Sequence, residues 1–168
     1  MRFLFVLLIA AGCGHSTAVP DAPPADFAVT AGWSTGSLPP QYHHSWRLDV
    51  ATDGAGTLAA ETGYGDGPSR TWTFRLADTD RDSLYTSLLT GDAFRAWSED
   101  RDPPVGGASW WARIQAGGET TEIPHFVTRR QNADKESLER VMRKAVPASV
   151  WAEHLNWLAE ARATLDGG

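Results

Sequence analysis

The histidines of this chain are the side chains whose charge changes near neutral pH, and they are also common metal ligands. His43 and His44 are adjacent, and neighbouring side chains of a strand point to opposite faces, so the two rings cannot grip one metal ion together. His125 could join either ring, but a three-ligand site needs another histidine or carboxylate, and no spacing signals one. His154 falls on the apolar side of a predicted helix, which favours a buried, neutral ring with one hydrogen-bond partner. We expect no metal and no cofactor.

A second candidate for chemistry is a serine in a glycine-flanked pentapeptide. Residues 32–36 read Gly-Trp-Ser-Thr-Gly, which matches the G-x-S-x-G motif of serine hydrolases. That motif works where a strand turns sharply into a helix and exposes the serine. Here Ser-Leu-Pro-Pro follows, and proline cannot continue such a helix. We therefore interpret residues 32–41 as a loop. A small hydrolase or metal-dependent enzyme that uses Ser34 with His43 or His44 remains the alternative function.

An acidic segment has part of the spacing of a calcium loop. Residues 78–82 read Asp-Thr-Asp-Arg-Asp, which places carboxylates at positions one, three and five. The loop also requires glycine at position six and glutamate at position twelve, where this chain has Ser83 and Leu89. Carboxylates are stabilised by the free N–H groups at the beginning of a helix. We therefore predict a helix N-terminus at this point, with Thr79 starting the helix.

Tryptophan is the unusual component of the composition, with eight residues in the chain. Most of them fall on inward strand faces or on apolar helix stripes, which predicts core positions; these are Trp46, Trp72, Trp97, Trp151 and Trp157. Trp33 is different, because it lies in the predicted loop. Trp110 and Trp111 are adjacent on a strand, so if Trp110 packs inward, Trp111 shares the outer face with Arg113.

Exposed aromatic rings mark binding surfaces, and the amphipathic indole suits sugars, peptides and interfaces. We therefore predict that Trp33, Trp111 and Arg113 bind the ligand of this protein. The alternative is that helices or loops cover these rings, since tryptophan is highly buried on average.

Alternating apolar and polar residues predict the strands that must position these side chains. Three runs, at residues 42–51, 57–64 and 69–76, read as an antiparallel meander. A short strand precedes them near Phe27, and a hairpin is predicted at residues 109–116 and 119–126.

Helical periodicity predicts three helices, at residues 80–90, 133–145 and 148–165, with Pro147 separating the last two. The order of the elements favours an α+β fold. We expect an antiparallel sheet of five to six strands with the three helices packed mainly on one face.

The N-terminal residues have the pattern of a secretory signal. One arginine is followed by an apolar run over residues 3–11, far short of the roughly 20 residues that span a bilayer as a helix. Ala10-Ala11-Gly12-Cys13 completes the segment and contains the only cysteine. The segment resembles the lipobox of small bacterial lipoproteins, with Ala10 where leucine is usual.

The resemblance implies that the chain is cut before Cys13 and that this residue carries palmitate or another acyl chain. Residues 1–12 would be the signal peptide, residues 13–26 the lipidated cysteine with a Pro-rich tether, and residues 27–168 a single domain. Glycine rather than aspartate after Cys13 implies the outer membrane in a Gram-negative cell. The alternative is an ordinary cleaved signal with an unrelated cysteine.

Charge and cysteine content limit the function further. The formal net charge of −6 provides no electrostatic surface for nucleic acid or anionic lipid head groups, so attachment to a membrane depends on the acyl anchor. Lipidation of Cys13 leaves no thiol for a disulfide. The sequence thus predicts a membrane-anchored, non-enzymatic binding module of the cell envelope, with a protein or glycan partner.

Overall fold

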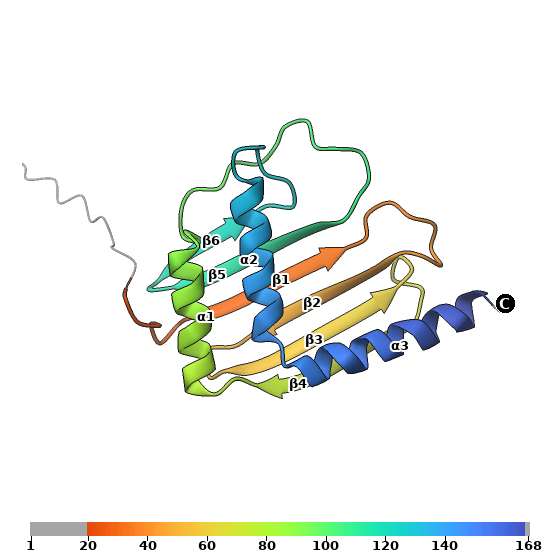
Figure 1. Ribbon diagram of the computed structural model, residues 1–168, viewed down its shortest axis with the longest axis horizontal. Helices are drawn as coiled ribbons and strands as arrows, with labels where there is room; N and C mark the ends of the chain where they lie inside the picture. The colour runs from red at the N-terminus through yellow and green to blue at the C-terminus, as the bar shows by residue number, and fades with distance from the viewer. Residues whose placement is uncertain (1–19, 167–168) are drawn as a thin grey trace, which may run out of the picture.

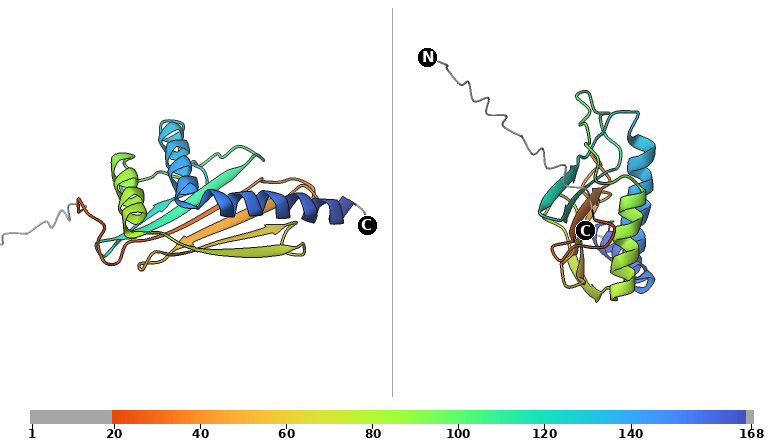
Figure 2. Two further views of the ribbon diagram at one scale, coloured as in Figure 1. Left: turned by 60° about the horizontal axis from the view of Figure 1, so that its bottom comes forward. Right: turned by 90° about the vertical axis from the view of Figure 1, so that its left-hand side faces the viewer.

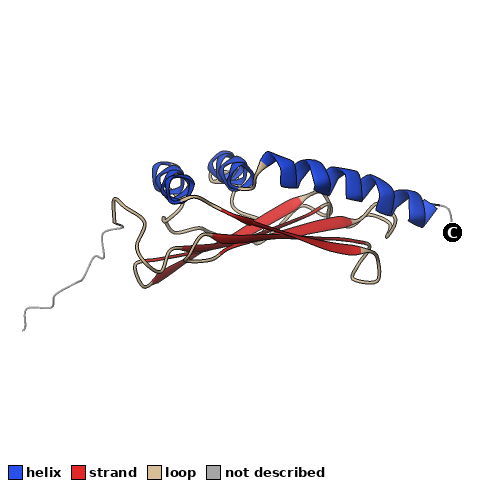
Figure 3. Cartoon of the chain, turned by 90° about the horizontal axis from the view of Figure 1, so that it is seen from below, coloured by secondary structure: helices blue, strands red, loops and turns tan. Residues whose placement is uncertain are grey.

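A six-stranded antiparallel sheet carries all the helices of the described chain on one of its faces (Figures 1 and 3). The computed structural model describes residues 20–166. The strands are β1 (Ala28–Ser34), β2 (His44–Val50), β3 (Ala55–Thr62), β4 (Ser69–Arg75), β5 (Ser109–Ala116) and β6 (Glu119–Ile123). The helices are α1 (Asp78–Thr90), α2 (Asn132–Ala145) and α3 (Ala148–Asp166). The strand order is β4-β3-β2-β1-β5-β6, and the predicted α+β class with helices on one face is confirmed.

The helices cover the sheet in two directions. Helices α1 and α2 lie beside each other and cross the strands, whereas α3 runs along β3 and β4 (Figures 1 and 2). The change of direction between α2 and α3 takes place at Val146 and Pro147. One end of the sheet is therefore covered by a helix pair and the other by the single helix α3.

The core lies between the helices and the sheet face beneath them. Alternation along each strand sends every second side chain to this face. The buried strand residues include Val29, Ala31, Trp46, Leu48, Leu58, Trp72, Trp110, Ala112 and Ile114. The opposite face is polar and carries the ion pairs Arg47–Asp49, at 2.9 Å, and Arg113–Glu122, at 2.7 Å. These inward and outward sets are the ones that the alternation predicts.

Several element boundaries differ from the prediction: β2 begins at His44 rather than at residue 42, β6 ends at Ile123 rather than at residue 126, and two further differences concern candidate residues. Strand β1 extends through Ser34, so the predicted loop beginning at Gly32 is wrong at its start. The reason is that β1 is paired on both sides, by β2 and by β5, and this pairing outweighs the weak strand preference of Gly32 and Ser34. Helix α1 begins at Asp78 and its N-cap residue is Ala77, so the prediction that Thr79 starts the helix is wrong. The expected acidic residues are present in the first turn.

Part of the segment predicted to be a tether contacts the domain. The Tyr85 hydroxyl donates a hydrogen bond to the Pro20 carbonyl at 2.6 Å. The Asp26 carboxylate accepts the N–H groups of Gly117 and Gly118 at 2.8 and 2.7 Å, and these two bonds lower its pKa. The predicted signal peptide and Cys13 lie outside the described residues. Among residues 20–166, no helix is both long and apolar enough to cross a membrane.

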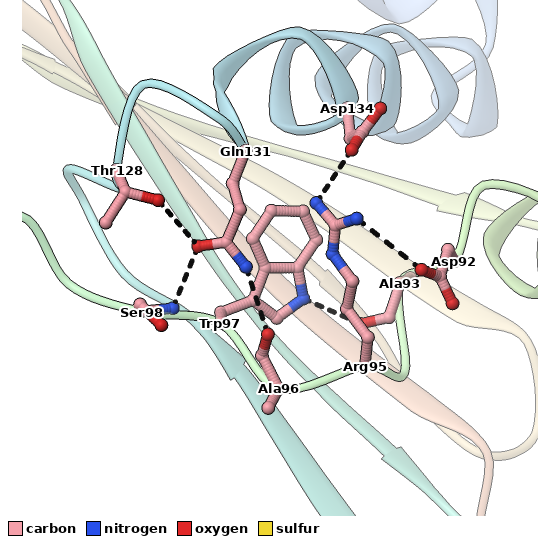
Figure 4. Close-up of polar contacts among 9 residues, drawn as sticks. All are labelled: Asp92, Ala93, Arg95, Ala96, Trp97, Ser98, Thr128, Gln131 and Asp134. Atoms are coloured by element: carbon pink, nitrogen blue, oxygen red, sulfur yellow. Dashed lines mark hydrogen bonds and ion pairs between the residues drawn. The ribbon is translucent and has the colours of Figure 1, made fainter.

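The Gln131 side chain connects the loop after α1 to the segment before α2 by hydrogen bonds (Figure 4). Its side-chain oxygen accepts the Ser98 N–H at 3.0 Å and the Thr128 hydroxyl at 3.3 Å. Its amide nitrogen donates to the Ala96 carbonyl at 3.0 Å. One side chain thus joins two segments that are about 30 residues apart in sequence.

Arg95 and Trp97 strengthen the same junction. The Arg95 guanidinium lies 4.3 Å from the centre of the Trp97 ring and is 2.8 Å from the Asp134 carboxylate of α2 (Figure 4). The Trp97 indole N–H donates to the Ala93 carbonyl at 2.9 Å. Because these contacts explain Trp97 as a structural residue, it is not a candidate for ligand binding.

We expect Gln131→Ala to lower the free energy of unfolding by about 1–2 kcal/mol, because three hydrogen bonds that order the loop are lost together. Urea denaturation followed by far-ultraviolet circular dichroism measures the change. Asn156→Ala, at an exposed position of α3, is the control and should not lower the transition midpoint, because alanine has the higher helix propensity. Equal midpoints for Gln131→Ala and the wild type would show that water replaces the lost bonds without cost.

Candidate ligand-binding groove

A groove of about 610 Å³ opens where the end of α2 and the beginning of α3 lie over β1 and β2. Its volume is within the range of roughly 300–1,000 Å³ that is usual for small-molecule sites. The apolar part of its lining consists of Trp33, Trp46, Val146, Pro147, Ala148, Trp151, Leu155 and Leu158. The remaining lining residues are His44, Arg143, Lys144 and His154.

The groove exists because α2 and α3 do not form one continuous helix. Val146 has an extended backbone, and Pro147, which lacks an N–H group, cannot continue the hydrogen bonding of α2. The helix axis therefore turns just above the sheet (Figure 2). Below the turn, Trp33 of β1 and Trp46 of β2 are register partners, and their rings are parallel with centres 6.4 Å apart. These two indoles form the floor of the groove.

Arg143 lies among three of the groove's aromatic rings. Its guanidinium carbon is 5.0 Å from the ring centre of Trp46, 5.4 Å from that of Trp151 and 5.6 Å from that of Trp33. Its Nε also forms an ion pair with Glu139 at 2.9 Å. The Trp151 indole N–H donates to the Arg143 carbonyl at 2.8 Å, which fixes the two helices relative to each other. The electron-rich faces of these rings are thus already occupied by a cation.

His154 is a buried polar residue in the groove wall. Only 4% of it is exposed, and its ring packs against Trp72 and Trp151 with centres 5.6 and 5.5 Å apart. Neither ring nitrogen has a hydrogen-bond partner within the described part of the chain, so the single partner expected from the sequence is missing. Burial, together with the nearby His44 and Arg143, lowers the pKa of His154 to about 4. The ring is therefore neutral at pH 7, as the sequence predicts.

His44 lies at the other side of the groove and is held by α3. Its Nδ1 is 3.1 Å from an Arg162 guanidinium nitrogen. A guanidinium can only donate hydrogen bonds, so the His44 Nδ1 accepts and the ring proton is on Nε2. Burial lowers the pKa of His44, and the charge of Arg162 lowers it further. His44 is thus a second neutral histidine next to a fixed positive charge.

The three residues predicted to bind ligand do not lie together. Trp33 lines the groove, whereas Trp111 and Arg113 are on the opposite, open face of the sheet. The Trp111 indole covers the backbone of Gly32, where an added Cβ would lie 2.5 Å from the indole nitrogen. Arg113 is paired with Glu122. Contacts within the fold therefore account for Trp111 and Arg113, and only Trp33 belongs to the groove.

The alternative enzyme was predicted to use Ser34 with His43 or His44, and the structure places Ser34 and His44 on opposite faces of the sheet. Ser34 is directed to the open face of the sheet by the alternation of β1, away from Trp33 and His44. His43 is buried, bonded through Nδ1 to the Gly63 carbonyl and stacked on another ring. His125 is near Ser109, with its Nδ1 3.3 Å from the hydroxyl. Within residues 20–166, no group of three or more His, Asp or Glu side chains is placed to hold a metal ion.

Sequence reasoning missed Arg143, Lys144 and the turn at Pro147 as parts of a site. Trp151 was expected only in the core. A signal is present in hindsight: a basic helix end, a proline break and a tryptophan one turn later occupy nine consecutive residues, 143–151. No family model matches the chain, and no curated protein matches it at a significant level.

Proposed function

We propose that this protein is a non-enzymatic binding module of the cell envelope, that lipid on Cys13 holds it at a membrane, and that the groove between α2 and α3 takes its ligand. The observation that carries the proposal is an open groove with three indole rings and a buried, unpartnered His154 in its walls. Concave, mainly apolar sites with a few polar groups are typical of small-molecule binding.

The composition of the walls favours an apolar ligand group. Leu155 is 62% exposed at the mouth of the groove, beside Trp33 and Trp151. A ligand that covers these side chains removes apolar surface from water, which is favourable. Polar groups capable of orienting the rings of a glycan are few in this lining. The apolar part of a ligand or of a partner molecule therefore fits the groove better than a bare sugar.

An uncharged fluorescent probe, N-phenyl-1-naphthylamine, tests this proposal. We expect a saturable increase in its fluorescence with the wild-type protein. Ala148→Trp places an indole into the lining and should weaken binding at least tenfold, which corresponds to about 1.4 kcal/mol. Ala152→Trp is the matched control, because Ala152 is exposed on α3 one turn later and does not line the groove.

Two results would contradict the proposal. One is the absence of saturable binding to the folded wild-type protein. The other is equal probe affinity in Ala148→Trp and Ala152→Trp, because binding would then take place elsewhere on the protein.

A further inference from the structure

We propose that the groove recognises a free, single-chain aliphatic carboxylic acid, whose chain lies along the tryptophans and whose carboxylate lies at the junction of α2 and α3. This inference rests on the proposed function, since it names the class of ligand for the same groove. It is supported by the charges of the lining, by the orientation of α3 and by a polar side chain without a partner.

The charged side chains that line the groove are all cationic. Arg143 and Lys144 are in the lining, whereas no Asp or Glu among the described residues lines it. Arg162 adds a third positive charge directly behind His44. Lys144 forms no ion pair within the part of the chain that the structure describes. Arg143 is already paired with Glu139, so Lys144 and Arg162 supply the positive charge that favours a ligand with a negative group.

The beginning of α3 adds hydrogen-bond donors at the same place. The N–H groups of Val150 and Trp151 bond to the Pro147 carbonyl, whereas those of Ala148 and Ser149 precede the first bond of the helix. These free donors favour an anion, whereas the negative end of the α2 dipole lies at the same junction and offsets the positive end of the α3 dipole. Ala148 lines the groove, and so does Lys144 at the end of α2. A carboxylate at this junction would meet donors from both helices.

The unpartnered ring of His154 is a further polar feature of the groove wall. It is 96% buried, it is part of the groove wall, and no described residue accepts or donates a hydrogen bond at its nitrogens. A buried polar group without a partner costs free energy, so such groups commonly mark a place where another molecule supplies the partner. Both ring nitrogens are themselves buried, so a ligand oxygen would reach them only when the surrounding indoles move.

Cationic ligands are disfavoured by the same geometry. The faces of Trp33, Trp46 and Trp151 that would attract an ammonium group already surround the Arg143 guanidinium. A second cation would be repelled by Arg143 and by Lys144. The aromatic walls are therefore left for apolar contact with an aliphatic chain.

The test compares three ligands with one chain and different head groups. Decanoate and decyltrimethylammonium, each below its critical micelle concentration, and 1-decanol, below its solubility limit, are used to displace N-phenyl-1-naphthylamine from the wild-type protein. We expect decanoate to bind at least fivefold more tightly than decanol, and the ammonium compound to bind most weakly. An equal affinity for decanoate and decanol would overturn the inference and leave the groove as an apolar site. Failure of the uncharged probe itself to bind would overturn the proposed function.

Two pairs of variants locate the carboxylate. Leu155→Gln and Leu155→Glu change the same exposed position to side chains of equal size, and the ratio of decanoate to decanol affinity should be at least fivefold lower in Leu155→Glu. Lys144→Gln should reduce this ratio about threefold. Arg140→Gln, an exposed change on α2 outside the groove, should leave it unchanged. A ratio that is the same in Lys144→Gln and the wild type would contradict the placement of the carboxylate.

Discussion

The free energy of unfolding of the wild-type protein should fall between pH 7 and pH 5, and the substitution His154→Leu is expected to make this fall smaller by about 2 kcal/mol. The pKa of His154 is about 4 in the folded protein, against 6.5 for an ordinary histidine. The unfolded chain therefore binds a proton at His154 as the pH falls through 6.5, whereas the folded protein does not until about pH 4. The stability is fully present above pH 6.5 and is lost progressively below it.

The groups that lower the pKa of His154 come from several elements. Burial is the largest cause, followed by the electrostatic coupling to His44 of β2 and by the positive charge of Arg143 of α2. Burial also lowers the pKa values of His44 and His125. Because those two groups remain in His154→Leu, the difference between the variant and the wild type isolates His154.

Urea denaturation at pH 7 and at pH 5 measures the effect. The free energy of unfolding should fall less in His154→Leu than in the wild type over this range. Trp157→Phe, which alters packing against the same ring without changing a titrating group, is the control and should keep the wild-type pH dependence. The same pH dependence in His154→Leu and the wild type would show that the folded protein accepts a proton at this ring.

Alanine in place of Cys13 is expected to abolish incorporation of radioactive palmitate and to release the protein from the membrane fraction. The lipobox resemblance makes this sulfur the attachment point, and the chain has no other cysteine. Several acyl chains on this residue would anchor the protein stably. A protein with a net charge of −6 is not attracted to an anionic membrane, so charge offers no second means of attachment. Loss of the single thiol should therefore remove the whole attachment.

Gly12→Ala is the matched control, because it keeps a small residue before the cleavage site. It should retain both the label and the membrane association. Persistent labelling of Cys13→Ala would eliminate the proposed anchor, and the groove proposal would stand without it, because the two proposals depend on different parts of the chain.

The sheet was the most predictable part of the fold. Alternation placed Trp46 and Leu48 on the covered face and Arg47 on the open face, and the structure confirms each position. The same rule separated Trp110 from Trp111. Strand alternation is a local property with a period of two residues, so it can be recognised without knowledge of the neighbouring strands. Trp33 was misplaced in a loop because the pairing that extends β1 comes from two distant segments.

The groove could not be predicted in the same way. Trp33 and Trp46 come from neighbouring strands, Arg143 from the end of α2, and Trp151 and His154 from α3. Periodicity predicts which face of its own strand or helix each residue lies on, but it does not show which helix end packs over which strands. The lack of a hydrogen-bond partner for His154 could not be predicted either, because it results from the three tryptophan rings that surround His154 in the folded protein.

The sequence by itself determined the α+β class, the inward and outward faces of the strands and the separation of the last two helices at Pro147, because each follows from local periodicity or from the chemistry of one residue. Only the tertiary structure decided that Trp33 and Trp111 lie on opposite sides of the sheet and that Arg143 occupies an aromatic groove. The direction in which α3 leaves Pro147 depends on how both helices pack against the whole sheet. That packing involves residues more than 100 positions apart, such as His44 and Arg162, which no local pattern relates.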